Sequence, residues 1–225
     1  MASSRSRTTQ HRRPGRPLQD PDGEGVRRRL LSTAAQLFAQ RGSAGVGLRE
    51  IARSAGVTPG MISYYFGDKH GLLLAVMGDV FERLFEGFRQ LAAAPPSERE
   101  LSVPESFVHL YIGVIGREPW IAPLIVREVL AQDSPLRAQF VEQFARRAAQ
   151  IVPPLFAREI QAGRLRADLD PALAVLSLLG MCVFPYLSHP VTGPVLGYEL
   201  DEAFQRRLME HTARLYLDGA RGPRA

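Results

Sequence analysis

The chain has 225 residues, of which 45% are hydrophobic and 23% are charged, and its formal net charge is +5. This length suits one modest domain plus a small one, and the apolar fraction is sufficient for a core. Cys182 is the single cysteine, which excludes a disulfide framework and a zinc-ligand cluster. Residues 1–75 hold 12 basic and 5 acidic side chains, whereas the remainder holds 16 and 18. A basic front part on a slightly acidic body is expected when the front part neutralises phosphates.

Residues 1–25 are rich in Arg, Ser, Pro and Gly, so we expect a disordered basic arm. The arm lacks the apolar core of a signal peptide. Its run Arg12-Arg13-Pro14-Gly15-Arg16-Pro17 is similar to an AT-hook, an extended element whose arginines lie in a narrow A·T-rich minor groove. We therefore predict minor-groove contacts from Arg12, Arg13 and Arg16. A solvated tail that adds only nonspecific attraction is the alternative.

The next segments predict three short helices. Leu31, Ala34, Ala35 and Phe38 follow the helical i, i+3, i+4, i+7 rule, and Gly42 is placed to end that helix. The stretch from 48 to 69, LREIARSAGVTPGMISYYFGDK, then predicts two helices joined by a tight turn. This spacing is typical of a helix-turn-helix, whose second helix enters a DNA major groove. An ordinary helical hairpin is the alternative.

Four residues set the geometry of this helix pair. Gly56 lies in the turn, and Ile62 returns to the core four residues after Thr58. We expect the Thr58 hydroxyl to cap the second helix, and Pro59 suits its first position because the missing N–H would be unpaired there.

From about Val26 to Met77 the chain resembles the DNA-binding domain of the TetR family of transcriptional regulators. The motifs that carry the resemblance are LFAQRG (37–42), REIARSAGVT (49–58) and ISYYFGDKHGLLLAV (62–76). The resemblance implies a helix-turn-helix domain at 26–75 and a helical effector-binding and dimerisation domain at 76–220. It also implies a bacterial source. From the composition we expect a cytoplasmic protein, and we do not expect an enzyme. Gly47 stands where the family usually has Thr or Ser, so one phosphate-contacting hydroxyl is missing.

The second helix of the pair has unusual chemistry for base recognition. Between Thr58 and Phe66 there is no Arg, Lys, Gln or Asn, so the strongest base-reading side chains are absent. Thr58 and Ser63 offer hydroxyls, and Pro59 and Met61 offer apolar contact to thymine methyl groups. Gly60 lets the backbone approach the DNA closely. The resemblance further implies that two tyrosines lie against the sugar-phosphate backbone. The predicted contacts are Thr58, Pro59, Gly60, Met61, Ser63, Tyr64 and Tyr65.

Two basic residues flank this helix. Arg49, at the start of the first helix of the pair, is the best candidate for reading a guanine, and a phosphate clamp is the equal alternative. Lys69 is the only lysine among the 28 basic side chains. The resemblance implies that Lys69 reaches a phosphate near the N-terminus of the following helix, whose amides also favour anions.

Beyond Gly71 the pattern stays helical, and no segment alternates with period two for long enough to predict a strand. We therefore predict an all-α fold. A proline pair, Pro153-Pro154, is expected to kink or split one long helix. The apolar run 172–187 is short for a membrane span and better suited to a buried helix, so no membrane partner is expected. The predicted helices span 73–91, 104–117, 120–131, 134–163, 171–187 and 201–218, with loops at 92–100 and before the last helix.

The resemblance implies a homodimer through the last two long helices, with burial inside one subunit as the alternative. It also implies a small-molecule pocket in the middle helices, where aromatic and flexible side chains favour a mostly apolar effector. Packing in the core is the alternative for each of them. The candidate pocket residues are Phe107, His109, Tyr111, Trp120, Phe144, Met181 and Phe184, with Tyr186 nearby.

The function expected from these patterns is a ligand-responsive homodimeric regulator, a repressor that binds a palindromic operator and needs no metal or cofactor. A transcriptional activator and an effector-independent regulator are alternatives. A helical enzyme or scaffold is a more distant one. The sequence contains no glycine-rich phosphate loop after a strand, no G-x-S-x-G elbow and no H-E-x-x-H pair.

Overall fold

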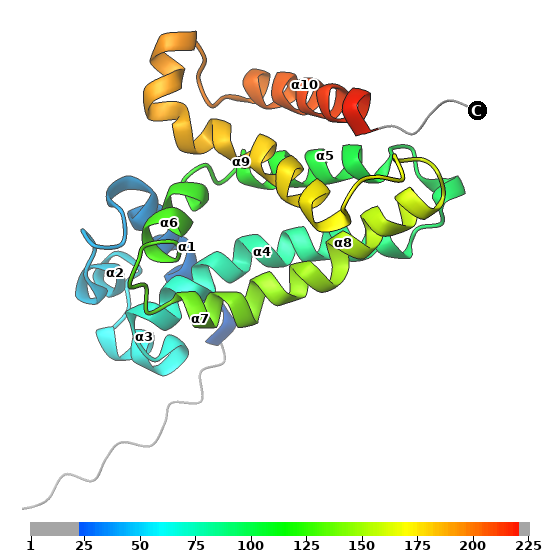
Figure 1. Cartoon of the computed structure of the whole chain (residues 1–225). Helices are drawn as coiled ribbons and strands as arrows, with labels where there is room; N and C mark the ends of the chain where they lie inside the picture. Colours follow the sequence, from blue (N-terminus) through cyan, green and yellow to red (C-terminus); the bar gives the residue numbers. More distant parts are fainter. Residues whose placement is uncertain (1–22, 221–225) are drawn as a thin grey trace, which may run out of the picture.

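The computed structural model describes residues 23–220, which form helices without any strand (Figure 1). The all-α prediction is confirmed. The elements are α1 (Gly23–Arg41), α2 (Leu48–Ser54), α3 (Pro59–Phe66), α4 (Lys69–Ala93), the 3-10 turn η1 (Pro96–Glu98), α5 (Val103–Ile115), α6 (Ile121–Glu128), α7 (Arg137–Phe140), the π-helical segment η2 (Val141–Ala145), α8 (Arg146–Gln161), α9 (Pro171–Leu196) and α10 (Glu202–Ala220).

Helices α1, α2 and α3 form the N-terminal part. Leu31, Ala34 and Phe38 of α1 are buried, as their spacing predicts, and Gly42 ends the helix with φ of +69°. Helix α1 starts at Gly23 and so includes Gly23–Gly25, which the sequence analysis assigned to the arm. Residues 1–22, with Arg12, Arg13 and Arg16, lie outside the described residues.

Helix α4 joins the N-terminal part to the body of the molecule. It crosses the boundary predicted at residues 75 and 76, and packs against α1 and α3 at one end and against α5 and α8 along its length. Its buried side chains serve two cores, with Leu72 and Met77 in the first and Leu84 and Phe88 in the second. The first core joins α1–α4 to α6, and the second joins α4 to α5, α8, α9 and α10.

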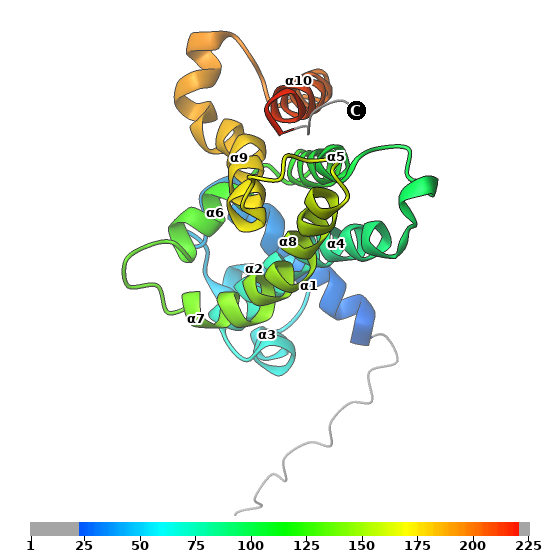
Figure 2. The ribbon, with the colours of Figure 1, turned by 45° about the vertical axis from the view of Figure 1, so that its right-hand side comes forward.

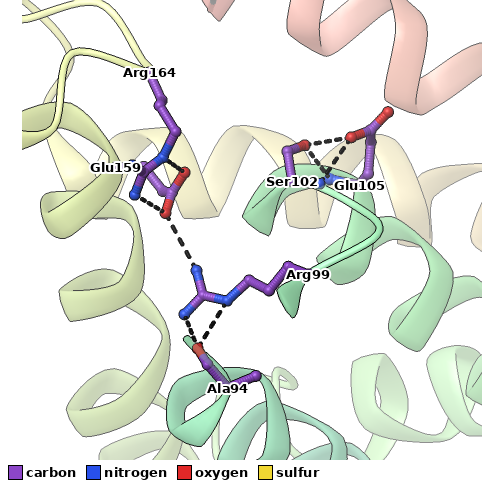
Figure 3. A network of polar contacts seen from close by, with 6 residues as sticks. All are labelled: Ala94, Arg99, Ser102, Glu105, Glu159 and Arg164. Carbon is purple, nitrogen blue, oxygen red and sulfur yellow. Dashed lines mark hydrogen bonds and ion pairs between the residues drawn. The ribbon is translucent and has the colours of Figure 1, made fainter. Parts of the chain in front are cut away.

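A buried carboxylate ties the far end of α8 to the α4–α5 connection (Figure 3). Glu159 accepts hydrogen bonds from Arg164, at 2.7 and 2.8 Å, and from Arg99, at 3.3 Å. Arg99 also donates to the Ala94 carbonyl at the end of α4. Because the carboxylate is enclosed by two guanidinium groups, its burial leaves no charge uncompensated.

Of the two outcomes expected for the proline pair in α8, a kink or a split, the split does not occur. Pro153 and Pro154 lie inside the helix, and the irregular turn falls earlier, at η2. The two prolines remove the N–H partners of the Ala149 and Gln150 carbonyls. Both of these residues are exposed, so water takes the place of the missing donors and the helix continues.

Helix α9 is longer than predicted, because it continues through Pro185, Pro190 and Pro194 to Leu196. Its second half bends away from the body, as Figures 1 and 2 show. Gly197, with φ of +69°, ends it. By length and composition alone it is the one helix among residues 23–220 that could cross a membrane.

Within one chain, helix α9 is buried on one side only. Ala174, Leu178, Cys182 and Tyr186 recur every four residues and lie in the core. The opposite side carries exposed apolar residues. These are Leu173, Leu176, Phe184, Val191, Val195 and Leu196.

The junction between α3 and α4 requires a glycine. Asp68 caps α4 by accepting a hydrogen bond from the Gly71 N–H at 2.8 Å. A Cβ atom on Gly71 would lie 1.9 Å from the carbonyl oxygen of Phe66, the last residue of α3. No side chain fits there unless the two helices separate.

Gly71→Ala should therefore destabilise the protein by about 1–3 kcal/mol, the usual cost of overpacking. The free energy of unfolding in urea measures the loss. Gly60→Ala is the control, since nothing lies within 4 Å of a Cβ on that helical glycine. It should be neutral or slightly stabilising. Equal stability of the two variants would contradict the junction constraint.

Candidate nucleic-acid interface

Helix α3 presents the predicted contact residues outward. Ile62 is fully buried and fixes the helix to the core. Pro59, Gly60 and Ser63 are exposed, and the Tyr64 side chain is 76% exposed. Met61 and Tyr65 are partly buried and border the same face. In both views α3 lies at the end of the molecule opposite α10, free to approach a large ligand (Figures 1 and 2).

The turn before α3 follows the predicted helix-turn-helix geometry. Gly56 has φ of +68°, a conformation that favours glycine. The Val57 N–H donates to the Ala52 carbonyl at 2.9 Å, and Ala52 is buried against the neighbouring helices. These contacts fix the angle between α2 and α3.

Thr58 occupies the N-cap position of α3, but its hydroxyl makes no capping hydrogen bond, so that prediction is wrong. The Met61 N–H donates instead to the main-chain carbonyl of Thr58, at 3.0 Å. Pro59 has no N–H to offer. The exposed Thr58 hydroxyl therefore remains available to a ligand of this face.

Two cations beside α3 have no acidic partner among residues 23–220. Arg49 is exposed at the start of α2, and Lys69 is partly buried at the start of α4. Neighbouring charges are paired: Arg41 contacts Glu50 at 2.7 Å. The hydrogen bond from Arg41 is the main reason that the pKa of Glu50 is lowered from its usual value. The positive potential of this face therefore comes from groups that are not neutralised internally.

The predicted pocket residues are not brought together. Phe107 and Tyr111 stack in the interior, with ring centroids 4.7 Å apart. Phe144 packs on Phe81 near α7, and Trp120 donates from its indole nitrogen to Glu118. The remaining three lie elsewhere, with His109 and Phe184 exposed and Met181 partly buried on α9.

Three side chains with polar atoms, Tyr111, Cys182 and Tyr186, form a cluster in the interior between α5 and α9. Burial raises the pKa of the Cys182 thiol to about 12 and of the Tyr186 hydroxyl to about 12, and it raises the pKa of Tyr111 as well. The Tyr186 hydroxyl is buried without a hydrogen-bond partner in the part of the chain that the structure describes. Such a group favours a ligand atom that hydrogen-bonds to it.

A second contact, besides α4, connects the two parts of the molecule and has no signature in the sequence. Ser43, in the α1–α2 loop, donates a hydrogen bond to Glu128 at the end of α6. The Arg127 guanidinium covers Gly42, where a Cβ would come within 2.5 Å of its Nη1. Helix α6 in turn packs against α9. Ser43 and Glu128 are 85 residues apart, so no local pattern marks them.

The sequence is similar to those of known bacterial transcriptional regulators. Residues 30–76 match the family model described as bacterial regulatory proteins, tetR family. The HTH-type transcriptional regulator BetI of Escherichia coli O45:K1 is 28% identical over 179 residues, covering 74% of this chain and 89% of the relative.

Two solved structures share the fold. The transcriptional regulator FadR from Bacillus subtilis, in complex with stearoyl-CoA, has a TM-score of 0.64 at 19% identity and covers 83% of this chain and 97% of its own. AibR, in complex with isovaleryl coenzyme A and operator DNA, has a TM-score of 0.63 at 20% identity and covers 84% and 97%.

The unpaired Lys69 predicts a measurable salt effect. Lys69→Ala should weaken DNA binding about equally for all sequences and reduce the slope of log affinity against log salt by about 1. Gel-shift titrations at several salt concentrations measure both quantities. Arg89→Ala on the same helix is the control, because Arg89 pairs with Glu86 far from α3. An unchanged slope for Lys69→Ala would rule out the phosphate contact.

Proposed function

We propose that this chain, a member of the TetR family of bacterial regulatory proteins, is a homodimeric transcriptional repressor that a small, mostly apolar effector releases from a palindromic operator. The observation that carries the proposal is the outward face of α3, with Ile62 buried beneath it and the unpaired Arg49 and Lys69 on either side. DNA binding requires access to the chromosome, so we place the protein in the cytoplasm.

The outward face of α3 supports a specific mode of recognition. Thr58 and Ser63 offer hydroxyls to base edges, and Pro59 and Met61 offer apolar contact to thymine methyl groups. Because α3 has no long donor, Arg49 is the side chain that we assign to a guanine. Tyr64 and Lys69 then hold the sugar-phosphate backbone and set the position of the helix without reading sequence.

The exposed side of α9 supports the dimer. Apolar side chains along this side, from Leu173 to Leu196, are uncovered in one chain, and Leu215 of α10 is exposed as well. A continuous apolar surface of this kind marks an interface. A two-fold pairing of α9 and α10 would present two α3 helices to successive major grooves, which explains the requirement for a palindrome.

The interior cluster of Tyr111, Cys182 and Tyr186 supports an effector site between α5 and α9. Its surroundings are apolar, and the unpartnered Tyr186 hydroxyl supplies one polar contact. FadR and AibR, which share the fold, are described with acyl-CoA ligands. Movement of α9 would reach the DNA-binding part through α6 and the Ser43–Glu128 hydrogen bond. The effector acts only to the extent that it prefers the arrangement unsuited to DNA.

A gel-shift titration against the DNA upstream of the chain's own gene tests DNA binding, with a preferred footprint and a steep loss with salt expected. In that assay Arg49→Ala should relax specificity at one base pair by about 1–3 kcal/mol. Arg53→Ala, an exposed arginine of the same helix, is the matched control. Uniform weakening across a panel of operator variants would instead assign Arg49 to a phosphate.

The dimer is tested by Phe184→Glu, which would place a charge in the proposed interface. We expect the dimer dissociation constant to rise about 100-fold or more, measured by analytical ultracentrifugation, because the carboxylate would be buried without a partner. Leu130→Glu is the matched control, since Leu130 and Phe184 are both 64% exposed and only Phe184 lies on α9. Wild-type association of Phe184→Glu would refute this interface.

A further inference from the structure

A groove lies between the DNA-binding part and the segment α7–η2–α8. It is separate from the interior cluster of Tyr111, Cys182 and Tyr186. Its volume is about 860 Å³, within the usual range for small-molecule sites of roughly 300–1,000 Å³. One wall comes from α1, α3 and α4, and the other from α7, η2 and α8. The lining residues that matter below are Arg27, Phe66, Gln139, Gln143, Phe144 and Arg147.

The wall made by η2 and α8 is held firmly in place. The ring of Phe144 stacks on Phe81, with centroids 5.1 Å apart. Arg147 donates two hydrogen bonds to Glu82, at 2.5 and 3.1 Å, and its guanidinium lies 4.2 Å from the centroid of the Phe85 ring. These charges compensate each other. The charges of this wall are therefore paired, and Phe144, which is 5% exposed, shows little of its ring to the groove.

The opposite wall carries a cation without an acidic partner. The Arg27 guanidinium lies over the Phe66 ring, 5.5 Å from its centroid, and pairs with no carboxylate among residues 23–220. Asp79, which also lines the groove, is 3.6 Å from Arg83. The charges of the groove thus leave Arg27 uncompensated.

Two amide side chains complete the set of unused polar groups. Gln139 and Gln143 line the groove, are exposed, and make no hydrogen bond within the described part of the chain. Each offers one acceptor and two donor hydrogens. They come from α7 and η2, and η2 is a π-helical segment, a feature frequent at functional sites.

We propose that this groove is a binding site for a flat aromatic monocarboxylate. The carboxylate pairs with Arg27, the ring packs beside the partly buried Phe66, and the amides of Gln139 and Gln143 bond its remaining polar atoms. A guanidinium and a carboxylate form strong charge-assisted hydrogen bonds, which makes the anion the preferred species. A cation would face Arg27 and be repelled.

Occupation of the groove fixes the DNA-binding part against α8, because the ligand contacts both walls. This regulatory consequence rests on the proposed function, in which the spacing of two α3 helices sets operator affinity. The binding site itself does not depend on that function. It is separate from the interior cluster of Tyr111, Cys182 and Tyr186, which offers no cation.

The test uses 1-naphthoate as the probe and isothermal titration calorimetry on the full chain without DNA. We expect 1-naphthoate to bind at least about tenfold more tightly than the neutral 1-naphthamide, and 1-naphthylmethylammonium not to bind. Arg27→Gln should abolish the preference for the anion. Arg28→Gln, the next residue of α1, is the matched control because Arg28 lines a different groove.

Gln143→Ala provides a second variant that leaves the Arg27–Phe66 contact intact. It should weaken 1-naphthoate binding severalfold, and its unfolding curve should match that of the wild type because Gln143 is exposed. Equal binding of the acid and the amide, or equal effects of Arg27→Gln and Arg28→Gln, would overturn the site. Because no DNA is present, failure of operator binding would refute the proposed function without affecting this result.

Discussion

The junction between α3 and α4 leaves no room for a side chain at residue 71, because a Cβ atom on Gly71 would lie 1.9 Å from the Phe66 carbonyl oxygen. This lack of a side chain lets α4 start directly beneath the end of α3, so that the recognition helix is fixed to the longest helix of the front half. In this position of α3, Ile62 is buried in the core, and Ser63 and Tyr64 are exposed to solvent. The same helix, α4, supplies side chains to both cores. The orientation of α3 is therefore coupled to the packing of the body through one rigid element.

Charged side chains fall into two groups, those that form ion pairs within the chain and those that do not. Away from α3, several arginines are paired with carboxylates: Arg147 with Glu82, and Arg99 and Arg164 with Glu159. Beside α3, the pair formed by Arg41 and Glu50 removes the nearest negative charge from the face. Arg49 and Lys69 are then free to contact phosphates or bases. Within residues 23–220, Arg49 and Lys69 belong to the positive excess of the front part and have no internal acidic partner, as an electrostatic binding surface requires.

The helices of the front part could be predicted from sequence because their determinants are local: periodic apolar residues, glycines at turns and Pro59 at a first position. Local sequence patterns were less informative where a backbone N–H or C=O group had more than one possible hydrogen-bond partner. The Met61 N–H bonds to the Thr58 carbonyl in place of its hydroxyl, and α8 continues through Pro153 and Pro154, whose missing donors leave the carbonyls of the exposed Ala149 and Gln150 without a helical partner.

Contacts between distant residues were beyond local patterns. Neither the Ser43–Glu128 bond nor the groove behind Arg27 has a sequence signature, because each joins segments that only the fold brings together. The candidate pocket residues show the same limit. Phe107 and Phe184 are both phenylalanines, but Phe107 is buried and Phe184 is exposed. Residue type alone therefore does not predict which aromatic side chains lie together.

The three prolines of α9 have a consequence for partner choice. Helix α9 continues through Pro185, Pro190 and Pro194 and bends, so its apolar side is curved, and in the proposed dimer a two-fold copy would have the same curve. A related regulator in the same cell with a straight helix at this position would meet that surface with gaps, and each gap forfeits dispersion contacts. In the proposed dimer, the bend would therefore favour pairing of identical chains over mixed dimers, because only an identical chain has the matching curve.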